Sequence, residues 1–463
     1  MHSRRLYFSA ICGAVLFAAS TRAQITDGDW MSIGGPVSGS GTYWPVYALA
    51  IDNAGKLYAG GTFSAVGGVL AGNIAKWSSG TWSVVGSGTN RFDTLGVAAL
   101  AVDHAGNLYA GGQFDTAGGI AAANIARWNG SAWSALGDVY GTVHALAVDA
   151  TGNLYAAGVF DSVGTIAAQN IAKWNGNTWT ALGTGTNRYL WVSTLAVDRP
   201  GNLYAGGIFT AAGGVPVGHI AKWNGSAWSA LGSGANGQVN ALVIDSSGNV
   251  YAGGDFDTAG GVAASHIAKW NGTVWATLGK GIEGSVTSLA FDSSGNLFAG
   301  GSFDTAGGIA AKNVARWDGS AWTPLGSGTN DYVRALAVDA SDNLYAGGYF
   351  TVAGGKASAF VAMCSLNGPP VRAMPHRAVN LSAASPSYDA RAGLMRIQLK
   401  VAAKVGYRIY TLCGRLEHCT PPRILPAGSH AVVVNTTSLA RGGYVLDFRA
   451  GSQSLRCRVM LCR

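Results

Sequence analysis

The sequence has few charged residues, few histidines and none of the short motifs that mark common enzymes. Asp, Glu, Lys and Arg make up 12% of its 463 residues, whereas Gly alone contributes 69. This composition suits close-packed sheets joined by tight turns and argues against disorder. The eight His are scattered, and no G-x-S-x-G, HExxH or paired-His pattern occurs. We therefore expect no catalytic residue, no cofactor and no metal site.

Long apolar runs are also absent after residue 23. Arg4 and Arg5 precede an apolar run at 6–19, which is shorter than a membrane span needs, and small residues at 21–23 suit cleavage. We interpret residues 1–23 as a secretory signal peptide and expect no transmembrane segment. The mature protein would then be secreted or held at the outer cell surface.

The chain contains one unit repeated seven times, the last copy being incomplete. Equivalent leucines are spaced by 51, 46, 49, 47, 47 and 47 residues. A period of this length indicates a repeated supersecondary unit. The leucines are Leu49, Leu100, Leu146, Leu195, Leu242, Leu289 and Leu336.

The copy at 239–285 shows what the unit is. Residues 239–245 and 250–256 read as strands joined by a Gly turn, and residues 266–270 and 274–279 read as two more. The dipeptide Asn271-Gly272 between the last two is a strong hairpin signal. Four short antiparallel strands without a helical period predict a propeller blade, which must stack on neighbours to bury its faces.

The two ends of the repeat region predict how the ring closes. The seventh copy lacks its fourth strand, and residues 29–34 (DWMSIG) match the fourth-strand pattern at 321–326 (AWTPLG). The N-terminal segment would therefore complete the last blade and leave no free edge strand. The fold class expected is all-β, a seven-bladed propeller of four-stranded blades followed by a small β-sandwich.

The remaining chain divides at a change of composition. Pro, Ser and Ala replace the repeat after residue 368, as in a linker. Beyond it, strands are predicted at 395–401, 407–412, 430–435, 444–449 and 455–461. The predicted organisation is a signal peptide at 1–23, a propeller at 24–368, a linker at 369–387 and a C-terminal β-sandwich at 388–463.

The two parts carry opposite charge. Residues 24–368 hold 14 Lys and Arg against 20 Asp and Glu, a net −6, whereas residues 369–463 hold 14 against 3, a net +11. The overall basic character is thus an average, and it does not indicate a nucleic-acid partner. The basic tail could meet an anionic surface such as lipopolysaccharide.

Two resemblances extend this interpretation. The double glycine Gly253-Gly254 and the later pair Trp270 and Trp275 resemble kelch-type propellers, such as the central domain of galactose oxidase. Similar repeats occur in fungal cortical polarity proteins and bacterial surface proteins. The resemblance implies the fold, and propellers serve many activities.

The C-terminal region resembles the sorting domain of type IX secretion. The matching stretches are 405–410, 414–415, 426–430, 439–444 and 458–461. The resemblance implies export by that secretion machinery, removal of the domain, and release or surface attachment. Four cysteines here, Cys413, Cys419, Cys457 and Cys462, are not part of the family pattern.

Cysteine pairing stays open. Five Cys remain after residue 23, an odd number. Cys364 replaces the blade tryptophan equivalent to Trp317, so we expect it in the core. The four tail cysteines could form two cross-strand bridges in an oxidising compartment, although Cys457 and Cys462 are about 16 Å apart in an extended strand and would not pair with each other.

An aspartate ends the first strand of every repeat. Each precedes a tight Gly turn, and one carboxylate per turn is too few for calcium, which takes six to eight oxygens. We expect each side chain instead to accept backbone N–H bonds within its turn. These residues are Asp52, Asp103, Asp149, Asp198, Asp245, Asp292 and Asp339.

Positions that vary between the repeats predict which face of the propeller binds a ligand. Thirteen of 15 Trp follow the framework; Trp44 and Trp191 do not, and both lie in loops entering the first strand. One residue into that strand, at the channel mouth, stand Tyr47, Ala98, His144, Ser193, Asn240, Thr287 and Arg334. The ligand-binding residues expected are Trp44, Tyr47, His144, Trp191, Asn240, Tyr332 and Arg334.

Such a rim favours a binding module for an extracellular glycan or another polymer. One alternative is a structural or protein-interaction scaffold that binds a surface protein, with the aromatics packed over the blades as plugs. A third alternative is a carbohydrate-active enzyme of sialidase type, using Arg91, Arg188 and Arg334, but its Asp-box pattern is absent.

Overall fold

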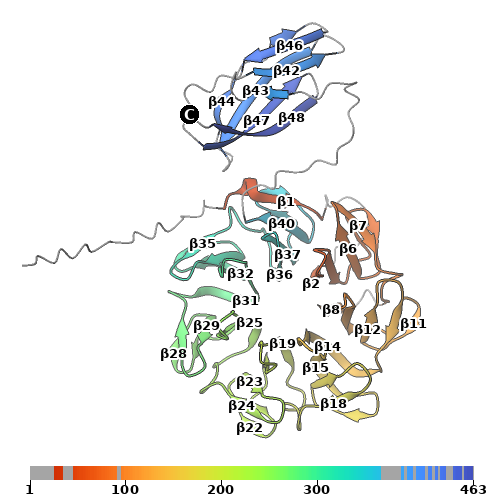
Figure 1. Cartoon of the computed structure of the whole chain (residues 1–463). Helices are drawn as coiled ribbons and strands as arrows, with labels where there is room; N and C mark the ends of the chain where they lie inside the picture. The colour runs from red at the N-terminus through yellow and green to blue at the C-terminus, as the bar shows by residue number, and fades with distance from the viewer. Residues whose placement is uncertain are drawn as a thin grey trace, which may run out of the picture.

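The computed structural model describes residues 25–34, 45–90 and 95–366 and, beyond these, separate strands between 387 and 461. Apart from the 3₁₀ helix η1 (Asp27–Asp29), every described element is a β-strand. Residues 25–366 form a ring of seven four-stranded antiparallel sheets around a central channel (Figure 1). The predicted all-β, seven-bladed propeller is confirmed.

Six blades have their strands in sequence order from the channel outward, and in the last blade the N-terminal strand takes the outer place. The innermost strands are β2 (Val46–Ile51), β8 (Gly96–Val102), β14 (Val139–Val148), β19 (Val192–Val197), β25 (Val239–Ile244), β31 (Ile282–Phe291) and β36 (Val333–Val338). The second strands are β3 (Leu57–Gly61), β9 (Leu108–Gln113), β15 (Leu154–Val163), β20 (Leu203–Gly207), β26 (Val250–Gly254), β32 (Leu297–Ala306) and β37 (Asn343–Gly348).

The outer half of each blade has two shorter strands. The third strands are β6 (Ile74–Ser78), β12 (Ile125–Trp128), β17 (Ile171–Trp174), β23 (Ile220–Trp223), β29 (Ile267–Trp270), β34 (Val314–Trp317) and β40 (Val361–Ser365). The outer strands are β7 (Thr81–Val84), β13 (Trp133–Ala135), β18 (Trp179–Ala181), β24 (Trp228–Ala230), β30 (Trp275–Thr277), β35 (Trp322–Pro324) and, for the last blade, β1 (Trp30–Ser32).

A small hairpin follows the second strand of each blade. Its strands are β4 (Ala65–Val66) and β5 (Val69–Leu70), β10 (Thr116–Ala117) and β11 (Ile120–Ala121), β16 (Ile166–Ala167) pairing with β15, β21 (Ala211–Ala212) and β22 (Val215–Pro216), β27 (Thr258–Ala259) and β28 (Val262–Ala263), β33 (Ile309–Ala310) pairing with β32, and β38 (Val352–Ala353) and β39 (Lys356–Ala357).

The ring closes through the N-terminal strand, as the sequence predicts. Strand β1 pairs antiparallel with β40, with Trp30 opposite Cys364. Both side chains are fully buried, and burial raises the pKa of the Cys364 thiol. The position where other blades carry the first tryptophan of a pair is therefore filled by a core cysteine.

Tryptophans join each blade to the one before it. The indole N–H on each outer strand donates to a backbone carbonyl of the preceding blade, at 2.5–3.0 Å in all seven cases. The bond from Trp30 to the Leu325 carbonyl belongs to this series and links the first and last parts of the ring. A buried indole that satisfies its N–H stabilises the contact between blades.

The double glycine permits the close approach of neighbouring strands. A Cβ on Gly347 would lie 2.6 Å from Cγ1 of Val46 in the next blade, and a Cβ on Gly348 would lie 2.0 Å from the Tyr332 carbonyl oxygen. Both distances are far below van der Waals contact, so a side chain at either position would push the strands apart.

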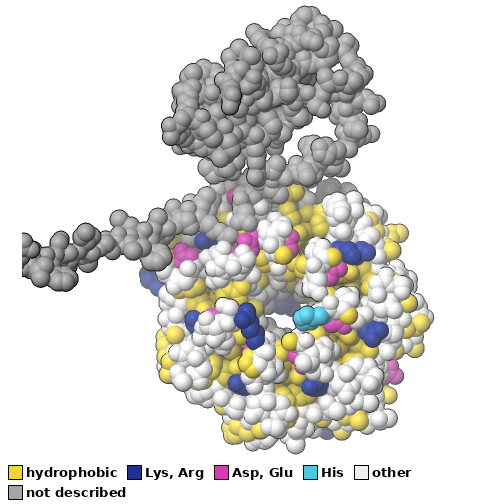
Figure 2. Space-filling view, in the orientation of Figure 1, with side chains coloured by type: hydrophobic (Ala, Val, Ile, Leu, Met, Phe, Trp, Pro, Cys, Tyr) yellow, Lys and Arg dark blue, Asp and Glu magenta, His cyan; other side chains and the backbone are white. Residues whose placement is uncertain are grey.

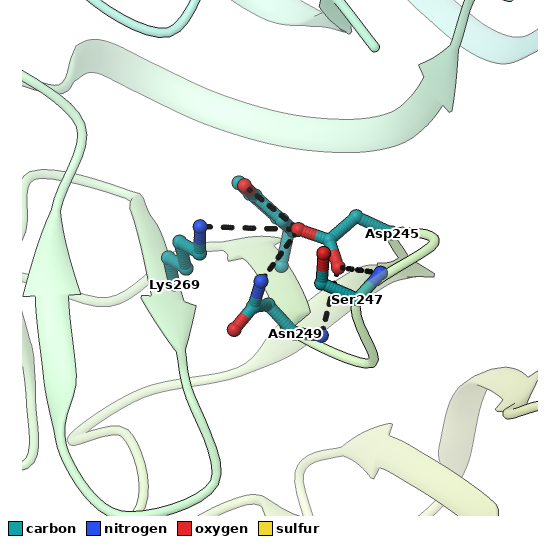
Figure 3. A network of polar contacts seen from close by, with 5 residues as sticks. Asp245, Ser247, Asn249 and Lys269 are labelled. Atoms are coloured by element: carbon teal, nitrogen blue, oxygen red, sulfur yellow. Dashed lines mark hydrogen bonds and ion pairs between the residues drawn. The ribbon is translucent and has the colours of Figure 1, made fainter.

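The aspartates that recur at the end of each first strand accept hydrogen bonds within their turns, as expected. Asp245 accepts N–H bonds from Ser247 and Asn249, and its other oxygen accepts the Asn249 amide at 2.7 Å and the Tyr251 hydroxyl at 3.4 Å (Figure 3). The Lys269 ammonium lies 3.8 Å from the same carboxylate. Burial raises the pKa of Asp245, but these hydrogen bonds and Lys269 lower it overall. The carboxylate is thus used by its own turn.

The C-terminal strands form two antiparallel sheets. One contains β41 (Ser387–Asp389), β42 (Leu394–Leu399) and β46 (Gly428–Val433); the other contains β43 (Ala403–Thr411), β44 (Leu416–Cys419), β45 (Arg423–Leu425), β47 (Gly442–Ala450) and β48 (Gln453–Leu461). All five predicted strands are present, with shifted ends. Residues 1–23 and most of the linker at 369–387 lie outside the described residues.

Candidate binding site at the channel mouth

A β-bulge in every innermost strand presents one variable residue. In the first blade, Val46 lies opposite Gly61 and Ala48 opposite Gly60, so Tyr47 is an extra residue with no partner. The same register shift recurs in the other six blades. Bulges redirect a side chain and are common beside binding sites. The bulged residues are Tyr47, Ala98, His144, Ser193, Asn240, Thr287 and Arg334.

All seven bulged residues line one cavity of about 200 Å³ at the centre of the ring. The next two residues of each innermost strand, a small residue and a leucine, complete its wall. Figure 2 shows a hollow at this place, with a histidine side chain at its edge. Small-molecule sites usually measure about 300–1,000 Å³, so this cavity accommodates one small group of a larger ligand.

An aromatic cluster borders the cavity between the last blade and the first. The phenolic oxygens of Tyr47 and Tyr349 lie 3.2 Å apart, with ring centroids 6.0 Å apart. The ring of Tyr332 lies 6.2 Å from that of Tyr349 and is half exposed. The Arg334 guanidinium lies over the Tyr47 ring, 5.9 Å from its centroid. The structure therefore brings together three of the predicted site residues and adds Tyr349.

Sequence comparison overlooked Tyr349, although a signal for it exists. Tyr349 directly follows the double glycine of its blade, and this position also varies between repeats. The equivalent residues are Thr62, Gln113, Val159, Ile208, Asp255, Ser302 and Tyr349. They form a second variable set beside the first.

A polar network lies elsewhere on the same rim. The Asn240 amide donates to the Asp255 carboxylate at 2.8 Å, and its carbonyl oxygen accepts the Gln238 amide at 2.6 Å. Gln238 also contacts the Ser193 hydroxyl of the neighbouring blade at 3.4 Å. Thr287 donates to the Val333 carbonyl at 2.5 Å. One part of the rim is thus aromatic and cationic, and another part offers hydrogen-bonding groups.

Charge is distributed unevenly in the cavity. Among the described residues that line it, Arg334 is the one Lys or Arg, and none is Asp or Glu. Burial and the charge of Arg334 lower the pKa of His144, so this imidazole is neutral at pH 7. Burial and the bond with Tyr349 raise the pKa of Tyr47 to about 12, so the phenol is neutral as well.

The other predicted residues are less closely associated with the cavity. Trp44 lies outside the described residues, so its predicted position opposite Trp191 remains a prediction. Trp191 is 39% exposed immediately before β19, and it does not line the cavity. Arg188 pairs with Asp161 at 2.9 Å and also lies outside the lining. Arg91 falls outside the described residues, so the suggested three-arginine arrangement is not established.

Within the described part of the chain, no group of three or more His, Cys, Asp and Glu side chains is placed to hold a metal ion. The same residues include no helix long and apolar enough to cross a membrane.

A family model of a propeller domain matches part of this chain. Residues 221–322 match the family model described as the Rax2 C-terminal beta propeller domain. No curated protein matches the sequence. Among solved structures, the extracellular domain of BT4673 from B. thetaiotaomicron is 13% identical, with 95% of this chain and 59% of that chain covered and a TM-score of 0.49.

Two further structures are similar at the same low level. PorZ, a surface component of the type-IX secretion system of Porphyromonas gingivalis, is 14% identical, with 94% of this chain and 61% of that chain covered and a TM-score of 0.43. Virginiamycin B lyase from Staphylococcus aureus is 8% identical, with 72% and 98% covered and a TM-score of 0.44. This chain spans about 60% of the length of BT4673 and PorZ.

Proposed function

We propose that this protein is a secreted or surface-attached binding module that takes the end of an extended glycan, or a similar extracellular polymer, at its channel mouth. One observation carries the proposal: seven bulges direct a residue that differs in every repeat into a single cavity. Packing determines the framework residues around them, whereas the bulged residues are free to differ. A ring of different side chains at one place is what selective binding requires.

The chemistry of the rim suits a sugar. The faces of Tyr332 and Tyr349 offer apolar surfaces on which a sugar ring stacks, and Asn240, Ser193 and Thr287 offer groups that bond hydroxyls. A cavity of about 200 Å³ limits entry to roughly one sugar residue. The rest of the polymer would lie across the rim, where Trp191 and, by the sequence prediction, Trp44 would contact it.

A protein-interaction scaffold is the second candidate. The small outer hairpins expose equivalent aliphatic residues in four blades: Ile120, Ile166, Val262 and Ile309 are 38–43% exposed. Exposed apolar groups in a repeated position favour contact with a partner protein. These groups are separated by whole blades, which makes them a weaker basis than the shared cavity. A carbohydrate-active enzyme ranks third because no catalytic pair has been identified in the cavity.

The same proposal includes the route of export. The kelch-like propeller at 24–368 would be exported across the outer membrane. Export would use a signal peptide at 1–23 and a type IX sorting domain at 388–463, which a linker at 369–387 joins to the propeller. Deleting residues 388–463 should then abolish export, which immunoblotting of culture fractions measures. Unchanged export after the deletion would rule out a sorting role for this region.

A screen of the full secreted protein against immobilised glycans and polysaccharides tests the proposed binding. We expect binding to a defined class of polymer, lost by at least tenfold in Tyr349→Ala. The matched control is Tyr189→Ala, which removes an exposed tyrosine outside the aromatic cluster. Failure of every glycan and polysaccharide to bind would contradict the proposal.

A further inference from the structure

We infer that the group recognised inside the channel mouth is an anion, the carboxylate of an acidic sugar residue, and that Arg334 holds it. This inference rests on the proposed function and specifies its ligand. It is carried by the surroundings of Arg334, by the charges around the cavity and by the shape of the rim.

Arg334 is exposed to the cavity and has no acceptor among the described residues. Its guanidinium has one recorded contact, the Tyr47 ring at 5.9 Å, and no hydrogen bond or ion pair with a described side chain. By contrast, Arg188 on another blade is engaged by both oxygens of Asp161, at 3.1 and 2.9 Å. A guanidinium has five N–H donors, so those of Arg334 are available for a ligand.

The described groups that line the cavity give the positive charge of Arg334 no counter-charge. Among them there is no carboxylate, and His144 and Tyr47 are both neutral at pH 7. Asp255 is bonded to Asn240 in the fifth blade, two blades from Arg334, and the Asp331 carboxylate accepts the backbone N–H of Tyr332. An anion at Arg334 would therefore meet a favourable charge without displacing an internal partner.

The rim suits a carboxylate that is carried on a sugar. A planar carboxylate accepts two parallel bonds from a guanidinium, a geometry that rewards arginine in particular. Tyr349 and Arg334 both contact the Tyr47 ring, and the Tyr332 ring lies against that of Tyr349, so two stacking surfaces lie beside Arg334. A uronate residue has both features, a carboxylate for the guanidinium and a ring face for the tyrosines.

Matched pairs of oligosaccharides test the inference. The probes are tetramers of galacturonate, glucuronate and mannuronate, each compared with its carboxyl-reduced form, which has the same linkage and no charge. Titration calorimetry of the full secreted protein at pH 7 and low salt should show at least one acidic tetramer binding tenfold or more tighter than its reduced form. Arg334→Gln should abolish this preference, and Arg334→Lys should keep part of it.

Arg199→Gln is the control, because it removes the same charge from an exposed turn at the other end of its blade's innermost strand. It should leave the preference unchanged. Equal binding of acidic and reduced forms, or a preference that survives Arg334→Gln, overturns the inference and leaves the proposed function intact. If the protein binds peptides with a free terminal carboxylate and binds no sugar, both the inference and the proposed function are overturned. Both are also overturned if it binds none of these tetramers and nothing in the wider glycan screen.

Discussion

The hydroxyls of Tyr47 and Tyr349 lie 3.2 Å apart although the two residues are separated by 302 positions in the chain. They belong to the first and last blades, so this contact spans the seam where the ring closes. The same seam is held by β1, whose three residues pair with β40. The aromatic part of the candidate site therefore depends on the N-terminal strand.

Removal of that strand should destabilise the whole ring. Deleting residues 24–35 removes the pairing with β40, the fully buried Trp30 side chain and its bond to the Leu325 carbonyl. Trp30→Ala alone should cost about 3–5 kcal/mol of unfolding free energy, because a large core cavity replaces the indole. Thermal unfolding followed by circular dichroism measures both. A melting temperature equal to that of the intact protein would refute closure by β1.

Truncation of rim aromatics should weaken binding without unfolding the protein. Trp191 is 39% exposed and Tyr349 is 37% exposed, so their replacement by Ala leaves a gap that is open to solvent and no closed cavity in the core. Loss of an aromatic anchor costs about 2 kcal/mol of binding free energy, which is more than tenfold in Kd. Affinity measurements on Trp191→Ala and Tyr349→Ala, with melting temperatures alongside, separate the two effects. Several kcal/mol of lost stability with unchanged affinity would identify the aromatics as structural plugs.

His144 should make stability depend on pH. Burial, together with Arg334, lowers its pKa in the folded state below the ordinary value of 6.5, so the unfolded chain binds the proton more readily. The stability associated with the neutral imidazole is therefore present above that value and is lost as pH falls through it. His219, which is partly buried, contributes in the same direction, because desolvation lowers its pKa as well. Denaturant unfolding at pH 7 and pH 5 should show a smaller difference in His144→Gln than in the wild type.

An anionic ligand should partly reverse the lowering of the His144 pKa. A carboxylate at Arg334 favours the protonated imidazole, so bound ligand raises the pKa of His144 and affinity increases as pH falls from 7 toward 5. In His144→Gln the affinity should stay nearly constant over that range. An identical pH profile in the two proteins would show that His144 does not face the ligand.

The Asp turns should prove independent of calcium. The Asp245 carboxylate already accepts two backbone N–H bonds, one amide and one phenol, so chelation with EDTA should leave the melting temperature unchanged. Asp245→Ala should lower stability by about 1–3 kcal/mol, because buried donors lose a charged acceptor. Ser247→Ala, which keeps the backbone N–H bond to Asp245, is the matched control. A drop in melting temperature with EDTA that calcium restores would favour the metal alternative.

The sequence alone predicted the blades, their number and their closure. These features recur with every copy, and each is expressed locally as alternating strands, a Gly turn or an outer tryptophan. The match of residues 29–34 to 321–326 therefore sufficed to pair β1 with β40. The sequence also placed Tyr47, His144, Asn240 and Arg334 at one mouth, because they occupy the same repeat position.

Only the tertiary structure decided what these residues do to one another. Each bulge arises from the way the innermost strand pairs with the second strand of its blade. The alternation of residue types along the sequence does not predict it. The contact of Tyr47 with Tyr349, the unpaired guanidinium of Arg334 and its effect on His144 arise between different blades. Such contacts depend on the radius of the closed ring and on the directions of the side chains, and these are properties of all seven blades packed together.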